Sequence, residues 1–271
     1  RRGIEIEALD LQGARFNIQR AFGDSLSNLQ VTLHKLFPPK AQIDSTGKRP
    51  IPLNLKELYL KDIHFTQRDS IKGSYLGVYL TESQIYVNSM NLPEQKIDIN
   101  SINIRRPIVT LNNWNAPPVP EPLEILDSLI QANTQSSNFE LSIGEFQLSR
   151  GQFVHHNYRK APVKLTADDQ LDLKHLDLYD LQVEIDSFHL NGDEYRGRIN
   201  WIAAKDRSGF QLERLSAKEA IISPREMTLN GMSIITPTSS LGDTLSFRYK
   251  SFDDWASFQE EVRMDARFHD A

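Results

Sequence analysis

The stretch Leu53-Asn-Leu-Lys-Glu-Leu-Tyr-Leu-Lys-Asp-Ile-His-Phe65 decides the fold, because its apolar residues follow a five-residue rhythm. The rhythm has the form apolar, any, apolar, any, any. In a regular strand, side chains alternate between the two faces, so each new apolar pair would point away from the previous pair. One extra residue between the pairs, a β-bulge, returns them to one face and bends the strand. The stretch therefore predicts a long, bulged and strongly curved strand with one apolar side.

The same rhythm recurs along the chain. Long copies begin at Ile4, Leu141 and Leu171, and shorter copies occupy residues 97–104, 183–190, 210–217 and 227–234. When strands of this kind pair side by side, their apolar side chains all lie on the same face of the sheet. We therefore expect a mostly β fold, built as a curved, bulged sheet of the antiparallel type.

Three segments break the rhythm and predict short amphipathic helices. Asp24 or Ser25 would cap the first, Pro122 would open the second, and Ser251 or Asp253 would cap the third. Each segment carries one apolar stripe and no flanking basic face, so we expect each helix to pack onto the sheet.

Composition limits the possible partners. The 271 residues carry a formal net charge of −5, and 39% of them are apolar. A nucleic-acid partner is not expected, because phosphate binding needs a concentrated basic face. The chain has no cysteine, which excludes disulfides, zinc ribbons and thiol nucleophiles and is compatible with a cell-envelope compartment.

A proline-rich stretch predicts the boundary between two halves. Residues 117–122 contain four prolines, which fit neither a strand interior nor a helix interior. We expect a β-rich half with one helix at residues 1–113, a linker at 114–122, and a β-rich half with helices at its start and end at 123–271. No apolar run is long enough to span a membrane as a helix. The start at Arg1-Arg2-Gly3 suggests a fragment whose targeting segment lies upstream.

Residues with catalytic or metal-binding potential have simpler explanations. His155-His156 lacks a third ligand at a suitable spacing, although Asp168-Asp169 is near in sequence. Asp193-Glu194 follows Asn191-Gly192, a preferred hairpin turn, so the turn explains these residues better than a glycosidase pair does. There is no nucleophile elbow, phosphate loop or dinucleotide fingerprint. We expect a chain that is not an enzyme, with no catalytic residues, metal or cofactor.

Three stretches carry a resemblance to a known family. The segment Met227–Ser239 contains Thr236-Pro237-Thr-Ser239, and it leads into a strand at residues 244–249 and then the helix expected near Phe258. This order resembles the AsmA-like family that includes the translocation and assembly module protein TamB. The run from Ile97 to Leu111, with its Arg106-Pro-Ile-Val, and the block at residues 53–65 with its following charged loop resemble strands of the same family.

The resemblance implies a function that the residues alone leave open. It implies an open β-taco whose apolar groove shields phospholipid acyl chains across the periplasm, and no catalytic residues. The full-length protein would be anchored in the inner membrane by a helix absent from this sequence and would engage an outer-membrane barrel protein. It would serve lipid transport, outer-membrane assembly or both. The groove candidates are the apolar positions of three blocks: Leu53, Leu55, Leu58, Leu60, Ile97, Ile99, Ile102, Ile104, Leu171, Leu173, Leu176 and Leu178.

Two alternatives stay open. The apolar rhythm fits a sealed core as well as an open groove, because both need one apolar side on each strand. A carbohydrate-binding or carbohydrate-cleaving β-helix would need exposed aromatic platforms on one face. The three tryptophans, Trp114, Trp201 and Trp255, share no spacing that predicts such a face.

Overall fold

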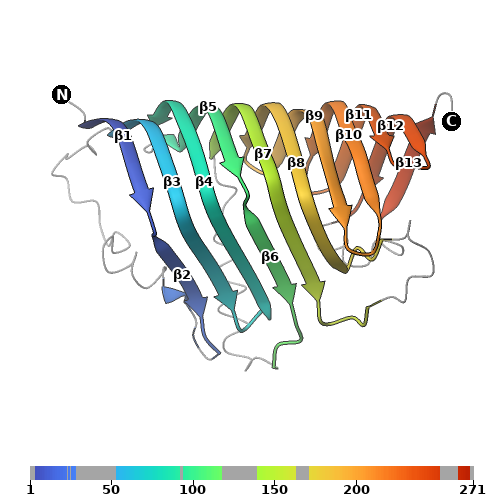
Figure 1. Ribbon diagram of the computed structural model, residues 1–271, viewed down its shortest axis with the longest axis horizontal. Coiled ribbons are helices and arrows are strands. Elements are labelled where there is room, and N and C mark those ends of the chain that lie inside the picture. The colour runs from blue at the N-terminus through green and yellow to red at the C-terminus, as the bar shows by residue number, and fades with distance from the viewer. Residues whose placement is uncertain are drawn as a thin grey trace.

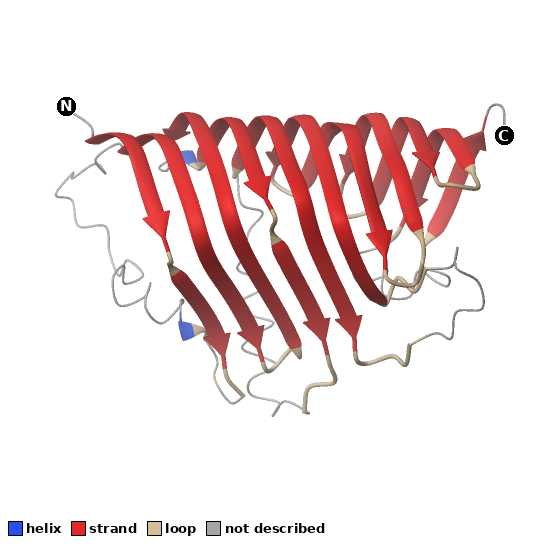
Figure 2. Cartoon of the chain, viewed as in Figure 1, coloured by secondary structure: helices blue, strands red, loops and turns tan. Residues whose placement is uncertain are grey.

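In the part of the chain that can be described, a computed structural model shows a single sheet of thirteen strands (Figure 1). The structure describes residues 4–22, 24, 26–28, 53–91, 94–117, 139–162, 171–250 and 262–268. The strands are β1 (Ile4–Gln12), β2 (Arg15–Arg20), β3 (Leu53–Asp69), β4 (Ser74–Asn91), β5 (Lys96–Arg105), β6 (Ile108–Asn113), β7 (Glu140–Asn157), β8 (His175–Asn191), β9 (Glu194–Asp206), β10 (Gln211–Ile222), β11 (Glu226–Ile235), β12 (Ser240–Arg248) and β13 (Arg263–Phe268). The prediction of a mostly β, curved and bulged sheet is confirmed (Figure 2).

Most neighbouring strands are antiparallel, with two exceptions. β1 and β2 follow one another along β3 and both run parallel to it. β5 and β6 likewise follow one another, antiparallel to β4 and parallel to β7. The sheet is therefore continuous from the strands before residue 114 to those after residue 139. β1 and β13 form its two ends (Figure 1).

A line of left-handed residues crosses the sheet from β1 to β8 and forms what we call the crease; β4 is the one strand along this line that contributes none. Register aligns the residues on adjacent strands, as the hydrogen bonds from Gly13 N to Lys61 O (2.9 Å) and from Arg106 N to Ser149 O (2.8 Å) illustrate. Each has a φ between 50° and 65°. The crease consists of Gly13, Asp62, Arg106, Arg150 and Asp180.

The crease explains the three-residue steps of the apolar rhythm. Asp62 stands between Leu60 and Ile63, and the left-handed residue lets both apolar side chains face the same way. Further irregularities occur at Ser187 (φ 52°) in β8 and Gly231 (φ 56°) in β11, again between apolar positions. The strands therefore bend repeatedly in one direction, as Figure 2 shows.

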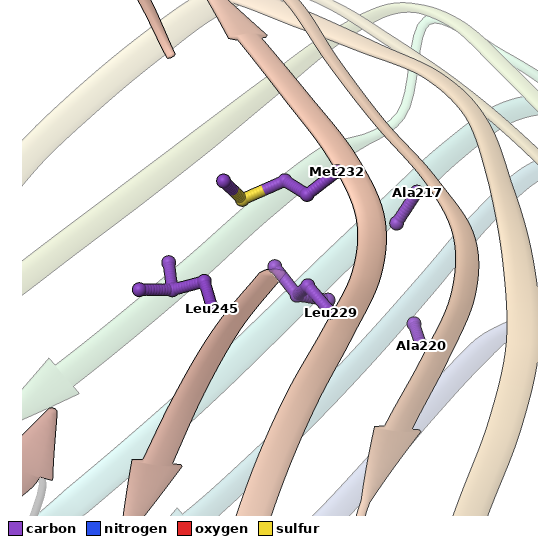
Figure 3. Packing of buried hydrophobic residues seen from close by; sticks show 5 residues of the cluster. All are labelled: Ala217, Ala220, Leu229, Met232 and Leu245. Carbon is purple, nitrogen blue, oxygen red and sulfur yellow. The ribbon is translucent and has the colours of Figure 1, made fainter. Parts of the chain in front are cut away.

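One face of the sheet is apolar from end to end. Residues paired across strands share a face, so the register defines rows of neighbours. The central row consists of Leu9, Leu58, Ile85, Ile102, Phe146, Ile185, Ile199 and Ala217. Ala217 also belongs to the buried cluster near the C-terminal end, where Figure 3 shows the side chains on the concave side of the bent strands β10 and β11. The apolar face is therefore the concave, inner face.

The outer face carries charged residues that pair across strands. Lys56 Nζ lies 2.8 Å from Glu7 Oε1, and Lys96 Nζ lies 3.0 Å from Glu140 Oε2. These side chains are half-exposed or more, so each pair contributes less than about 1 kcal/mol. The convex face is therefore polar, whereas the concave face is apolar.

The predicted helices fall almost entirely outside the described residues. This holds for residues 29–36 of the first segment, 122–130 of the second and 251–261 of the third. Within the ranges that the structure describes, no helix is long and apolar enough to cross a membrane.

Candidate functional site

Apolar rows extend the central row in both directions along the strands. One neighbouring row contains a single polar residue, Ser83, whose exposed fraction is 3%. This row consists of Leu11, Leu60, Ser83, Ile104, Leu148, Val183, Ile202, Leu215, Ile234 and Leu241. Another row consists of Met90, Ile97, Leu141, Leu190, Tyr195, Ile222, Met227, Phe247 and Met264. We call the whole concave apolar face that contains these three rows the trough.

The apolar side chains of the trough are only partly buried. No large side chain in the described part of the chain is fully buried, and members of the central row such as Ile102 and Phe146 keep some exposure. Exposure is greatest at the two ends of the sheet, where Leu9 is 43% exposed and Met264 57%. A monomeric protein rarely exposes a continuous apolar surface of this length unless something binds there.

Most of the predicted groove residues lie in the trough or in its continuation. Leu55, Leu58, Leu60 and the four isoleucines at 97, 99, 102 and 104 occupy inner positions of β3 and β5. Leu176 and Leu178 continue the inner face beyond the crease, where Leu178 pairs with Phe153. Leu53 begins β3 and pairs with Ile4.

The expected strand does not include Leu171 and Leu173, because β8 begins only at His175. Leu173 lies in a turn and is 61% exposed. The Asp172 carboxylate causes this turn: its Oδ1 accepts a hydrogen bond from Lys174 N (3.0 Å), and its Oδ2 lies 3.1 Å from His175 Nδ1. A side chain that bonds the backbone two residues on replaces the extended conformation with a turn.

Sequence reasoning missed the trough residues of β4. Ile85 is in the central row, but its strand does not show the rhythm clearly because Ser83 occupies an inner position. Pairing with Leu58 and Ile102 is what places Ile85 on the inner face. The alternation of Ile85 and Val87 was the only local signal for it.

The adjacent histidines point to opposite sides of the sheet. His155 pairs with Leu111 on the inner side and its Nδ1 lies 3.2 Å from Leu111 O. His156 faces outward, with its ring centroid 6.1 Å from that of His175. The two cannot bind one ion together, and in the part of the chain that the structure describes no three His, Asp or Glu side chains are grouped as metal ligands would be. Asp168-Asp169 lies outside the described residues.

The acidic pair lies at a turn. Gly192 adopts a φ of 58° between β8 and β9, so a hairpin turn is confirmed here, but the turn residues are Gly192 and Asp193, because Asn191 ends β8 and pairs with Glu194. Glu194 Oε1 accepts a hydrogen bond from Arg196 Nη2 (3.2 Å). Both side chains of this contact are half-exposed on a strand end.

Two tyrosines on the outer face have perturbed acidity. The hydrogen bond from the Tyr59 hydroxyl to Glu57 Oε2 (2.6 Å) raises the pKa of Tyr59 to about 12. The Tyr79 hydroxyl donates to Asp62 Oδ1 in the crease (3.0 Å), which also raises the pKa of Tyr79. A carboxylate acceptor favours the protonated phenol, because ionisation would place two negative charges together. Both contacts are structural, since neither tyrosine faces the trough.

Comparison with known proteins adds no assignment. No family model matches the chain, and no curated protein matches it by sequence.

Proposed function

We propose that the trough shields the acyl chains of phospholipids. One observation carries the proposal: apolar rows, interrupted by Ser83, run across most of the sheet on its concave face, and most of their side chains stay partly exposed. An acyl chain fits this surface because it is apolar along its whole length and needs no hydrogen bonds.

Energetics favour a lipid occupant over water. Burial of one methylene group contributes roughly 0.8 kcal/mol, so an acyl chain of ordinary length recovers several kcal/mol even when only part of it contacts protein. A sugar or peptide would bury hydroxyl or amide groups against rows whose side chains offer no partner, and each unpaired group costs about 1–3 kcal/mol. Ser83, almost fully buried, is the one polar side chain in the second row.

A sealed core is the main competing interpretation. Among the residues that the structure describes, the sheet is a single layer, and no described element packs against the trough from the other side. This supports an open trough.

The cellular setting is part of the same proposal and is supported by the family resemblance alone. We place the protein in the periplasm, as a non-enzymatic segment of an envelope-spanning protein. The longer chain would be anchored in the inner membrane and would reach an outer-membrane barrel partner. Transport of lipid and assistance to barrel assembly both use the same apolar surface.

Photo-crosslinking tests the proposal with matched neighbours on opposite faces. Ile99 and Ile185 lie on the inner face, whereas the adjacent Asp98 and Glu184 lie on the outer face. A photo-reactive residue at either inner position, in the full protein in cells, should capture phospholipid, and one at either outer position should not. Adducts confined to the protein at both inner positions would show a sealed core. Equal lipid capture on both faces would show non-specific contact, and either result would overturn the trough.

A further inference from the structure

A cleft of about 440 Å³ lies on the outer face, at the end of the sheet beyond the crease. Its lining residues come from three places that are far apart in sequence: the β3–β4 hairpin, the end of β6 and the turn after β7. These ends meet at the lower edge of the sheet in Figure 1. The cleft is lined by Arg68, Tyr75, Asn112, Trp114 and Tyr158.

The cleft is on the side opposite the trough. Tyr75 pairs with Asn112, while the neighbouring residues Leu76 and Leu111 pair on the inner face. Asn112 in turn pairs with His156, so the polar row continues across β7. A ligand in this cleft would not compete with one in the trough.

Specific contacts hold the cleft in shape. Trp114 N donates to Gly73 O (2.9 Å), and Gly73 has a φ of 65° in the β3–β4 turn. Any Cβ at Gly73 would lie 2.2 Å from Trp114 O, so only glycine permits this approach. Arg159 donates through Nε to Trp114 O (3.0 Å) and through Nη2 to Lys72 O (2.5 Å), which ties the turn after β7 to the other two segments.

Aromatic rings form much of the wall. The Tyr75 side chain lies over Gly77, whose added Cβ would be only 2.7 Å from the Tyr75 hydroxyl oxygen. Arg68 places its guanidinium carbon 5.6 Å from the centre of the Trp114 ring. Tyr158 is 61% exposed and its hydroxyl lies 3.4 Å from His156 Nδ1. The rings thus provide apolar surface beside polar groups.

One polar atom of a lining residue, just behind the surface of the cleft, has no donor. Asn112 Oδ1 is buried and has no hydrogen-bond partner among the described residues. A buried acceptor without a partner costs about 1–3 kcal/mol, which a ligand hydroxyl would recover.

We propose that this cleft binds a pyranose ring of a carbohydrate. A sugar presents an apolar C–H face that stacks on aromatic rings, and hydroxyl groups that both donate and accept hydrogen bonds. Here the Asn112 amide turns toward the ligand so that one hydroxyl donates to Oδ1, and a second hydroxyl accepts from Arg68. An anion would supply no donor for Asn112, and no carboxylate lines the cleft to attract a cation. The cleft volume is within the range of small-ligand sites.

Isothermal titration of the purified chain with cellotetraose, chitotetraose and maltotetraose tests the proposal. We expect saturable binding of at least one tetrasaccharide, with a Kd on the order of 1 mM or tighter. Asn112→Leu and Tyr158→Ala should each weaken binding at least about tenfold, since one removes the acceptor and the other a wall. Trp201→Ala is the matched control, because Trp201 is an exposed aromatic residue on β9 outside the cleft.

The outcomes separate the proposal from its rivals. Tyr158→Ala removes an exposed side chain and should keep the fold, so its effect reports on the cleft even if Asn112→Leu proves unstable. Binding that survives Tyr158→Ala and any folded Asn112→Leu protein, or that is lost equally in Trp201→Ala, would overturn the site. So would the absence of saturable binding for all three tetrasaccharides. None of these results depends on lipid capture in the trough.

Discussion

Replacement of a crease residue by glycine should stabilise the protein, although glycine normally weakens a strand. Arg150 in β7 has a φ of 54°. A left-handed conformation costs a residue with a Cβ roughly 1–2 kcal/mol. Glycine avoids this cost, but it loses more backbone entropy on folding, which lowers the free energy of unfolding by about 0.5–1 kcal/mol. The difference predicts that Arg150→Gly raises the free energy of unfolding by about 0.5–1 kcal/mol.

The residue before it provides the matched control. Ser149 lies in the same strand and does not have a positive φ. Ser149→Gly should therefore lower the free energy of unfolding by about 0.5–1 kcal/mol. For a protein of this size, 1 kcal/mol shifts Tm by about 2–4 °C, so thermal unfolding followed by circular dichroism separates the two variants. Arg150→Val should lower Tm, because a β-branched residue tolerates positive φ poorly.

A fall in Tm for Arg150→Gly as large as that for Ser149→Gly would refute the reasoning. It would mean that Arg150 is extended like its neighbours and that the crease does not store backbone strain. The bend of the sheet would then need another cause.

Three further changes test the face assignments. Ile143→Ala should lower the free energy of unfolding by about 2–3 kcal/mol in urea denaturation, because this inner side chain is 8% exposed and leaves a cavity; a loss under about 0.5 kcal/mol would contradict its burial. Gly77→Val should displace the Tyr75 ring and abolish tetrasaccharide binding while circular dichroism stays unchanged; unchanged affinity would argue against Tyr75 as a wall. The hydrogen bond to Glu57 raises the pKa of Tyr59 to about 12. This bond stabilises the folded state fully at pH values below the pKa of about 10 that tyrosine has in the unfolded chain. This stabilisation should disappear between pH 10 and 12, and the difference in tyrosinate absorbance between the wild type and Tyr59→Phe should titrate near 12 rather than 10.

The sequence alone was sufficient to predict the class of fold and the character of one face. The alternation of side chains is a local property of an extended backbone, so the spacing Leu58, Leu60, Ile63 predicts a bulge wherever the strand lies. Asp62 adopts the left-handed conformation at that bulge. The hairpin near Asn191-Gly192 was predictable for the same reason, because its signal is contained in adjacent residues, although the turn itself is Gly192-Asp193.

Only the tertiary structure decided how the strands pair and what they bring together. Backbone hydrogen bonds between strands are nearly independent of side-chain identity, so the sequence does not show that β5 and β6 run parallel to β7 or that five left-handed residues align in one crease. At Leu173 the apolar rhythm predicts a strand, but the chain forms a turn, because the Asp172 carboxylate accepts a hydrogen bond from the backbone of Lys174. The aromatic cleft joins Tyr75 and Tyr158 from separate hairpins. Such a cleft exists only after long-range pairing, because each hairpin supplies one wall and no single segment contains its spacing.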